Sequence, residues 1–298
     1  MKHVANVSGG KDSLAHLLLI LDLGLPLDEV LYFNNGMDFQ AIGNIFKKLK
    51  PMLEARGVAL IELHPENDFL YDMLDRPVES KKKGKHNGYG WCGGVCRWGT
   101  SEKIATLNKY AQGAVQYIGI AADEVHRRAE LTGNKKSILV ERGIKEADCL
   151  KYCRDRGWNW HEPTPMTESG FVDLYDILDL VSCWCCSNKN LKELYNIYRY
   201  LPTYWERLKK LQEQIARPMK KYTCNQYGEY GNLFDLEKVF RAEEANPTAF
   251  YRRYLMTMDL GAASGDIRYC PDCQHFVGCE CFDGSPCDLF AKKTEEKP

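Results

Sequence analysis

The sequence predicts an α/β fold in which helices cover both faces of a mostly parallel sheet. Short apolar stretches alternate with longer amphipathic ones through the first half of the chain, which is the pattern of strands and helices in such folds. Glycine-rich or polar turns follow several of the apolar stretches. We therefore expect a doubly wound sheet, followed by a helical segment and a small cysteine-rich module.

The predicted strands are short and the predicted helices carry one apolar face. Strands are expected over residues 3–7, 29–33, 59–63 and 115–119. Helices are expected over residues 13–23, 39–56 and 100–111, the last one capped by Thr100. Later helices are expected over residues 143–157, 192–215 with a break near Pro202, 236–244 and 247–258, and a loop is expected over residues 158–175.

Composition places the chain among globular proteins. It has 298 residues, of which 44% are hydrophobic and 27% charged, and its formal net charge is −1. This balance argues against a protein that coats nucleic acid nonspecifically. The basic run from Lys81 to His86 is either a solvated mobile loop or a phosphate contact. Because neither a signal peptide nor an 18-residue apolar run is present, we expect a cytoplasmic protein without a membrane partner.

A glycine-rich turn between the first strand and the first helix has the composition of a phosphate cradle. Its residues are Ser8, Gly9, Gly10, Lys11, Asp12 and Ser13. Glycines expose backbone N–H groups, the helix directs its positive end at the same point, and Lys11 adds a mobile cation. The spacing excludes a Walker A loop and a dinucleotide fingerprint. The six residues resemble the PP-loop of the ATP pyrophosphatase superfamily.

Polar residues follow two other predicted strands and are expected at the same edge of the sheet. Asn34, Gly36 and Asp38 follow the second strand, and Asp123 and Glu124 follow the fourth. The two acids can carry Mg²⁺, or they can pair with nearby arginines. Arg127 is a candidate fork for a phosphate or sulfate.

A segment rich in glycine and cysteine precedes the helix expected at residue 100. Arg97 and Lys103 lie close to the start of that helix, an arrangement that favours an anion. The spacing Cys92-x3-Cys96 is typical of no common zinc knuckle. These two cysteines can be either ligands or buried thiols.

Thirteen cysteines in a chain without an export signal favour reduced thiols, metal ligands or redox chemistry. Cys149 and Cys153 lie four residues apart on one predicted helix and are expected in the core. The remaining clusters are predicted metal ligands: Cys183, Cys185, Cys186, Cys270, Cys273, Cys279, Cys281 and Cys287.

The motifs follow one another in an order that resembles the phosphoadenosine phosphosulfate (PAPS) reductase family, over about residues 4–211. The resemblance implies a Rossmann-like domain that binds an adenosine nucleotide (ATP, adenylyl sulfate or PAPS) on residues 8–13. One branch of the family carries a 4Fe–4S cluster on a Cys-Cys pair and a distant Cys-x2-Cys, which Cys185–Cys186 and Cys270–Cys273 match loosely. The competing assignment is a zinc knuckle formed within the tail. The family's C-terminal Glu-Cys-Gly-x-His motif is missing.

The expected organisation is a nucleotide-binding domain over residues 1–182, a cysteine-rich turn and helices over 183–260, a metal knuckle over 261–291 and a disordered tail over 292–298.

Two reactions remain open. In sulfonucleotide chemistry Lys11, Arg97 and Arg127 neutralise the anion and Cys186 takes the sulfur group, with a thioredoxin-like donor. In ATP pyrophosphatase chemistry Asp12 and Asp123 hold Mg²⁺ while a tRNA base or small metabolite is adenylated. A non-catalytic nucleotide-binding regulator is the third class.

Overall fold

The computed structural model describes residues 1–81, 84–92, 95–219, 222–224, 228–230 and 232–245. The chain divides into two compact units. The first unit holds residues 1–175 and 180–188, and the second holds residues 176–179 and the chain from residue 189 onward. The segment from Cys183 to Cys186 therefore belongs to the first unit.

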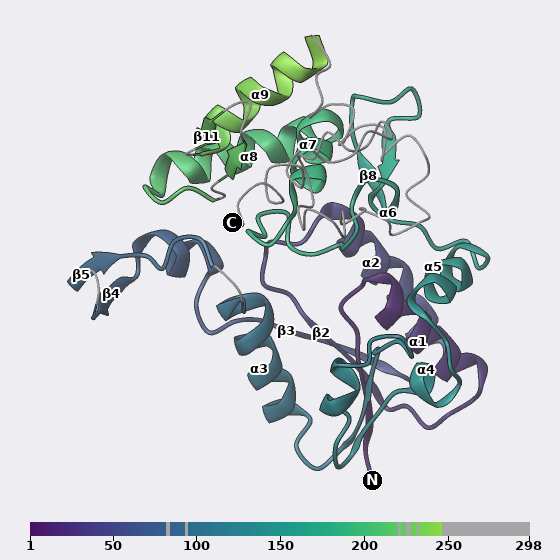
Figure 1. Cartoon of the computed structure of the whole chain (residues 1–298). Helices are drawn as coiled ribbons and strands as arrows, with labels where there is room; N and C mark the ends of the chain where they lie inside the picture. The colour runs from purple at the N-terminus through teal and green to yellow at the C-terminus, as the bar shows by residue number, and fades with distance from the viewer. Residues whose placement is uncertain (82–83, 93–94, 220–221, 225–227, 231, 246–298) are drawn as a thin grey trace, which may run out of the picture. The chain divides into compact units, whose positions relative to one another are not determined.

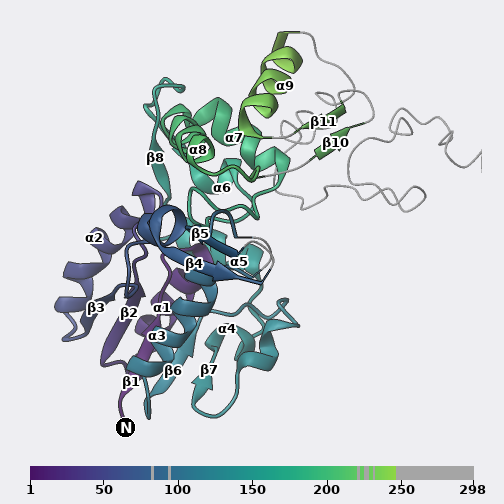
Figure 2. The same cartoon turned by 90° about the vertical axis from the view of Figure 1, so that its left-hand side faces the viewer.

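A parallel sheet organises the first unit and confirms the predicted α/β class. Within the described residues its strand order is β3-β2-β1-β6-β7, and every pairing is parallel (Figure 2). The strands are β1 (His3–Asn6), β2 (Glu29–Phe33), β3 (Ala59–Leu63), β6 (Val115–Ile118) and β7 (Lys135–Lys136). The order changes direction beside β1, which is the point where sheets of this kind bind ligands.

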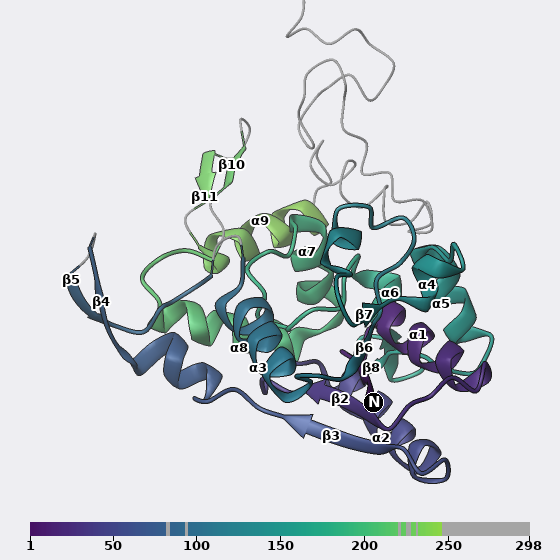
Figure 3. The same ribbon diagram turned by 90° about the horizontal axis from the view of Figure 1, so that it is seen from below.

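Helices cover both faces of this sheet. Figure 3 shows α1 (Lys11–Asp22) and α2 (Gln40–Glu54) on one side of the strands and α3 (Lys103–Tyr110) on the other. Right-handed crossovers produce this arrangement when the chain moves first one way and then the other from β1. Two shorter helices, α4 (Ile138–Glu141) and α5 (Glu146–Arg154), contact α1.

The core lies between the sheet and its helices. On the α3 face the buried cluster is formed by Val4, Leu31, Phe33, Leu107, Ala111 and Ala114. On α2 the buried apolar residues recur every three or four positions, because only one stripe of that helix faces the protein. Each fully buried large apolar side chain contributes roughly 1.5–3 kcal/mol, so this packing fixes the strand ends that the candidate site uses.

The segment between β3 and α3 is less regular than predicted. It contains the π-helical turn η1 (Tyr71–Asp75), the hairpin of β4 (Pro77–Ser80) and β5 (Gly84–Asn87), and the π-helical turn η2 (Arg97–Glu102). The predicted cap Thr100 is wrong. Cys96 is the N-cap residue, and its sulfur accepts from the Gly99 N–H at 3.3 Å.

The middle of the chain also differs from expectation. The helix expected over residues 143–157 is shorter: α5 begins at Glu146 and ends at Arg154. The expected loop over residues 158–175 contains a hairpin of β8 (His161–Pro163) and β9 (Phe171–Asp173), followed by the start of α6 (Leu174–Ile177). Short strands flanked by prolines and glycines carry too little periodicity to be recognised from sequence.

The second unit is mainly helical where it is described. The predicted break near Pro202 is confirmed, since α7 (Leu191–Tyr200) ends just before this proline and α8 (Pro202–Gln214) begins on it (Figure 1). The hairpin of β10 (Tyr222–Cys224) and β11 (Gly228–Tyr230) follows, and then α9 (Leu233–Ala245). The aromatic rings of Tyr195, Trp205 and Phe240 pack together as core. The helix predicted over 247–258 and all five C-terminal cysteines lie outside the described residues. No helix in the described part of the chain is both long enough and apolar enough to span a membrane.

Candidate functional site

The turn from residue 8 to residue 10 joins β1 to α1, as predicted. Gly9 has a φ of 78°, and a Cβ there would lie 2.9 Å from Ile42 Cγ2, so the position requires glycine. The indole Nε1 of Trp160 donates a hydrogen bond to the Gly9 carbonyl at 2.7 Å. The turn is therefore held from outside by α2 and by a residue 151 positions away.

The start of α1 leaves the loop open to an anion. Gly10 is the N-cap residue and supplies no side-chain cap. The Ser8 and Ser13 hydroxyls share a hydrogen bond of 3.0 Å, and the Lys11 N–H donates to the Tyr175 hydroxyl at 2.7 Å. The remaining first-turn amides and the helix dipole make this end a site for negative charge.

Lys11 is not the mobile cation that the sequence suggested. Its side chain is buried, and its ammonium lies 2.9 Å from Asp12 Oδ1 and 2.7 Å from Glu146 Oε2. Burial lowers the pKa of Lys11, but the two carboxylates outweigh burial and raise it overall. The cation is therefore clamped, because α5 brings Glu146 to a lysine that the sequence places 135 residues away.

Further carboxylates gather around this clamp. Asp123 accepts a hydrogen bond from the Glu146 N–H at 3.1 Å. Burial raises the pKa of Asp12, Lys11 opposes that rise, and the charges of Glu146 and Glu124 add to it. The structure thus brings together the predicted residues Asp12, Asp123 and Glu124, and it adds Glu146.

The loop after β6 packs closely against the first turn of α1, beside the glycine-rich turn. A Cβ on Gly119 would lie 2.6 Å from Ser13 Cα, which only a glycine allows. Farther along this loop Arg127, the predicted anion fork, instead pairs with Glu124 at 2.6 Å and Glu130 at 3.7 Å. An anion would have to compete with these two carboxylates for the Arg127 guanidinium.

In the turn after β2, the side chains that were predicted to bind a ligand make hydrogen bonds within the protein. Asn34 donates to Glu62 Oε1 at 2.7 Å and accepts from the Gly36 N–H at 2.8 Å. The buried Tyr32 hydroxyl donates to Asp38 Oδ2 at 2.8 Å. Burial raises the pKa of Asp38, with this hydrogen bond opposing the rise.

This turn also contacts the cysteine segment of the same unit. The Asn35 amide donates to Cys183 Sγ at 3.1 Å, and the Trp184 N–H donates to the Met37 carbonyl at 3.0 Å. Burial raises the pKa of Cys183 to about 12, and the Asp38 charge adds to the rise. Burial lowers the pKa of Lys103, which Asp38 and Cys183 partly oppose. A predicted cation, a carboxylate and a thiol therefore share one neighbourhood.

Cysteines from two distant segments affect one another beside this turn. Cys92 and Cys96 share a hydrogen bond, which raises the pKa of Cys96 ahead of burial, and the charges of Cys186 and Cys96 both act on Cys183. The Ser187 hydroxyl donates to the Cys92 carbonyl. Among the described residues no three His, Cys, Asp or Glu side chains close around a metal-sized point. The set nonetheless has the number and softness of donors that zinc or an iron–sulfur cluster takes.

The other cysteines of the first unit have different surroundings. Cys185 is buried. Cys149 and Cys153 are fully buried, as the prediction of core thiols requires, and Cys153 donates to the Lys11 carbonyl at 3.6 Å. Arg97 is exposed and its guanidinium stacks 3.9 Å from the centre of the Tyr89 ring.

Glu146, Trp160, Tyr175 and Asn35 were not predicted from the sequence. The first three reach the site from segments that carry no motif of their own, whereas Asn35 lies in the predicted turn between Asn34 and Gly36. The one available signal is the position of Glu146 at the start of a predicted helix, where acids are common for structural reasons.

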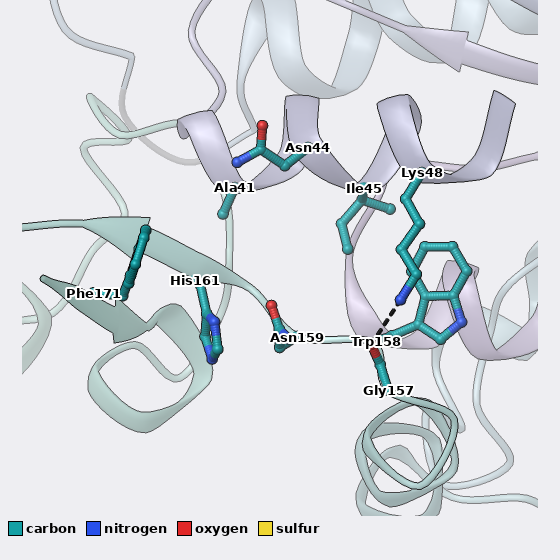
Figure 4. A pocket seen from close by; sticks show the side chains of 9 residues that line it. All are labelled: Ala41, Asn44, Ile45, Lys48, Gly157, Trp158, Asn159, His161 and Phe171. Carbon is teal, nitrogen blue, oxygen red and sulfur yellow. Dashed lines mark hydrogen bonds between the residues drawn. The ribbon is translucent and has the colours of Figure 1, made fainter. Parts of the chain in front are cut away.

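A separate cavity of about 200 Å³ lies between α2 and the hairpin of β8 and β9 (Figure 4). Lys48 crosses it, donating to the Gly157 carbonyl at 2.7 Å with its ammonium 4.2 Å from the Trp158 ring centre. Asn159 and His161 complete the near wall. None of the predicted site residues lines this cavity.

Comparisons with known proteins give distant matches. No known family model matches the chain. The uncharacterized protein MJ0066 of Methanocaldococcus jannaschii is 24% identical over 215 residues, which are 70% of this chain and 41% of that protein, so the chain spans less than half of its relative's length. The solved U34-tRNA thiolase NcsA from Methanococcus maripaludis, with its 4Fe-4S cluster, is similar at a TM-score of 0.38 and 16% identity, over 56% of this chain and 61% of that one.

Proposed function

We propose that the chain is a PP-loop enzyme that binds Mg²⁺–ATP on residues 8–13, splits it between the α- and β-phosphates, and uses its thiols in a sulfur transfer. The observation that carries this proposal is the clamp of Lys11 by Asp12 and Glu146, with Asp123 and Glu124 beside it. Carboxylates next to a phosphate cradle repel a bare anion, whereas they favour a polyphosphate that arrives with a divalent cation.

The roles of the phosphate-binding residues follow from their positions. Open amides at the start of α1 would bind the phosphate oxygens, and Lys11 would turn from its carboxylates to the nucleotide. Asp12 and Glu146, released from Lys11, would then hold Mg²⁺, with Asp123 next to them. The turn of Asn34, Gly36 and Asp38 follows the neighbouring strand, where the adenosine would lie.

The reaction breaks one phosphoanhydride bond. A carbonyl oxygen of the acceptor attacks the α-phosphorus, and pyrophosphate leaves with the bridging oxygen. Hydrosulfide then attacks the adenylated carbon, the carbon–oxygen bond breaks so that AMP leaves with that oxygen, and loss of the S–H proton leaves a thiocarbonyl. Lys11 would stabilise the negative charge that develops on the leaving phosphates, and a Mg²⁺ ion held by Asp12 and Glu146 would add to that stabilisation.

The four thiols Cys92, Cys96, Cys183 and Cys186 would hold a zinc ion or an iron–sulfur cluster near the reacting carbon. Such a group supplies bound, deprotonated sulfur ligands and a fixed position for the donor. Asn35 orients Cys183 by its hydrogen bond to the sulfur. We propose this set beside the two assignments that the sequence left open, which are the Cys185–Cys186 pair with Cys270–Cys273 and a zinc knuckle within the tail. What supports it is the hydrogen bond between Cys92 and Cys96 and the effect of Cys96 and Cys186 on the pKa of Cys183.

The product nucleotide tests the proposal. The chain, incubated with ATP, Mg²⁺, sulfide and total unmodified tRNA, is expected to release AMP and pyrophosphate, and Lys11→Ala is expected to abolish the release. Formation of ADP and phosphate would contradict it.

A second candidate is sulfonucleotide chemistry, which the neighbourhood of Lys103, Asp38 and Cys183 favours because it places a cation and a thiol together. Release of sulfite from adenylyl sulfate or PAPS with a thiol donor, lost in Cys186→Ser, would support this reaction in place of the first.

A further inference from the structure

The hairpin of β4 and β5 forms an arm on the first unit. Its strands pair in antiparallel register from Pro77 opposite Asn87 to Ser80 opposite Gly84. Figures 1 and 3 show it extending away from the sheet of its own unit. None of its described residues is buried: Val78, Ser80 and His86 are half-buried and the others are exposed.

The arm concentrates positive charge in a chain that is nearly neutral. Residues 76–97 contain six Lys and Arg residues and one acidic residue, Glu79, although the whole chain has a net charge of −1. Lys81 and Lys85 are exposed at the end of the arm. Lys82 and Lys83 continue the sequence run and lie outside the described residues.

The base of the arm is fixed to the body of the unit. Arg76 pairs with the buried Asp72 at 3.1 Å, and the Gly88 N–H donates to the Arg76 carbonyl at 2.8 Å. A Cβ on Gly88 would lie 2.3 Å from the Met73 carbonyl oxygen, so the two backbones touch. A held arm loses less conformational freedom on binding than a free loop does.

Cations continue from the arm toward the thiols. The Tyr89 ring has the Arg97 guanidinium 3.9 Å from its centre and the Arg76 guanidinium 5.8 Å from it. Arg97 follows Cys96 directly. The described cations therefore run from Lys81 and Lys85 through Arg76 to Arg97, with an aromatic face among them. Rows of cations with an aromatic platform suit a phosphodiester chain and its bases.

We propose that this basic arm binds a nucleic acid through its phosphodiester backbone and so guides it to the thiol cluster. The binding goes beyond the proposed function and does not depend on it. Only the delivery of a base to the thiols rests on the proposed sulfur transfer.

Salt-dependent binding tests the arm. The full chain, without ATP, is titrated into a fluorescently labelled unmodified tRNA transcript at several salt concentrations, and in parallel into a DNA duplex and into vesicles rich in phosphatidylserine. The double variant Lys81→Gln/Lys85→Gln is compared with Lys47→Gln/Lys50→Gln, which removes the same charge from exposed positions on α2. All four lysines are exposed, so both variants are expected to keep the wild-type melting temperature.

The arm variant is expected to bind tRNA about tenfold more weakly at low salt, and the slope of its log binding constant against log salt concentration should be smaller by about 2. The affinity of the α2 variant should stay within about twofold of that of the wild type. Binding of the duplex as well as tRNA supports backbone recognition, and binding of tRNA alone supports the arm as an RNA site. Absence of nucleic-acid binding by the wild type, equal losses in both variants, or arm-dependent binding to the vesicles alone would each overturn the proposal. A chain that binds tRNA and yet forms no AMP would refute the proposed reaction and leave the arm standing.

Discussion

The ammonium of Lys11 lies 2.7 Å from the carboxylate of Glu146, which joins the start of α1 to the start of α5. Lys11 also contacts Asp12, so its charge is compensated twice before any ligand arrives. A phosphate must displace a carboxylate to reach this lysine, and a divalent cation that binds the displaced carboxylates makes the exchange easier. Nucleotide and Mg²⁺ are therefore expected to bind cooperatively.

Removal of the Glu146 charge should weaken the coupling between the binding of ATP and the binding of Mg²⁺. In Glu146→Gln the lysine is freer, so binding of ATP without Mg²⁺ is expected to strengthen several-fold, whereas the gain in affinity on adding Mg²⁺ should shrink about tenfold. Titration calorimetry with and without Mg²⁺ measures both. The matched control is Glu168→Gln, which removes a charge from an exposed position outside the clamp. Equal behaviour of the two variants would show that Glu146 does not take part in binding.

The close approach of Gly119 to α1 predicts a local packing effect. Gly119→Ala would place its Cβ 2.6 Å from Ser13 Cα, forcing backbone to move at a cost of about 1–3 kcal/mol and weakening nucleotide binding. Gly43→Ala on α2 meets nothing within 4 Å and is expected to raise stability by about 0.5–1 kcal/mol. Urea unfolding measures both changes. A Gly119→Ala variant as stable as the wild type would contradict the observed contact.

His16 predicts the acid limb of the stability curve. The side chain is 1% exposed, its Nε2 accepts from the Ile138 N–H at 3.0 Å, and burial lowers its pKa from 6.5 to about 3. Below pH 6.5 the unfolded chain binds a proton at His16 that the folded chain does not, which favours the unfolded state. The stability that the neutral, buried His16 contributes is therefore complete above pH 6.5 and is lost as the pH falls toward 3.

At pH 5 the loss amounts to about 2 kcal/mol from this group alone. His16→Gln keeps an acceptor but does not titrate, so its free energy of unfolding should fall less between pH 7 and pH 5 than that of the wild type, by about that amount. Parallel curves for the two proteins would show that His16 is not the group responsible.

The thiol cluster predicts which cysteines govern metal content. Protein purified without oxygen is expected to contain zinc or to show the visible absorption of an iron–sulfur cluster, and Cys96→Ser or Cys183→Ser should lose most of that metal. Cys153→Ala, which removes a core thiol under Lys11, should retain it. Loss of the metal in Cys270→Ser with retention in Cys96→Ser would return the assignment to the C-terminal cysteines.

Local signals in the sequence were sufficient for four strands of the sheet, for the glycine-rich turn between β1 and α1 and for the break at Pro202. Strand, glycine turn and helix around Gly9 are consecutive, and proline at the first position of α8 acts through its own ring. The contact between Lys11 and Glu146 could not be predicted from the sequence, because the two residues come together only when α5 packs on α1. The capping role of Cys96 was missed for another reason: a π-helical turn moved the helix start away from Thr100, the ordinary capping residue.

The grouping of the two cysteine pairs could not be predicted from the sequence either. Cys92-x3-Cys96 and Cys183-x2-Cys186 could each be recognised as a pair, but their meeting depends on the turn after β2, where Asn35 contacts Cys183 and Met37 contacts Trp184. Neither contact has a sequence pattern.

A crystal structure of the chain with Mg²⁺ and α,β-methylene-ATP would show whether the Lys11 clamp opens for a nucleotide. We expect the phosphates to lie over residues 8–13, Lys11 to have turned from Glu146 to a phosphate oxygen, and the cation to contact Asp12 or Glu146. A nucleotide bound elsewhere, or bound on this loop with the clamp of Lys11 and Glu146 intact, would contradict this expectation.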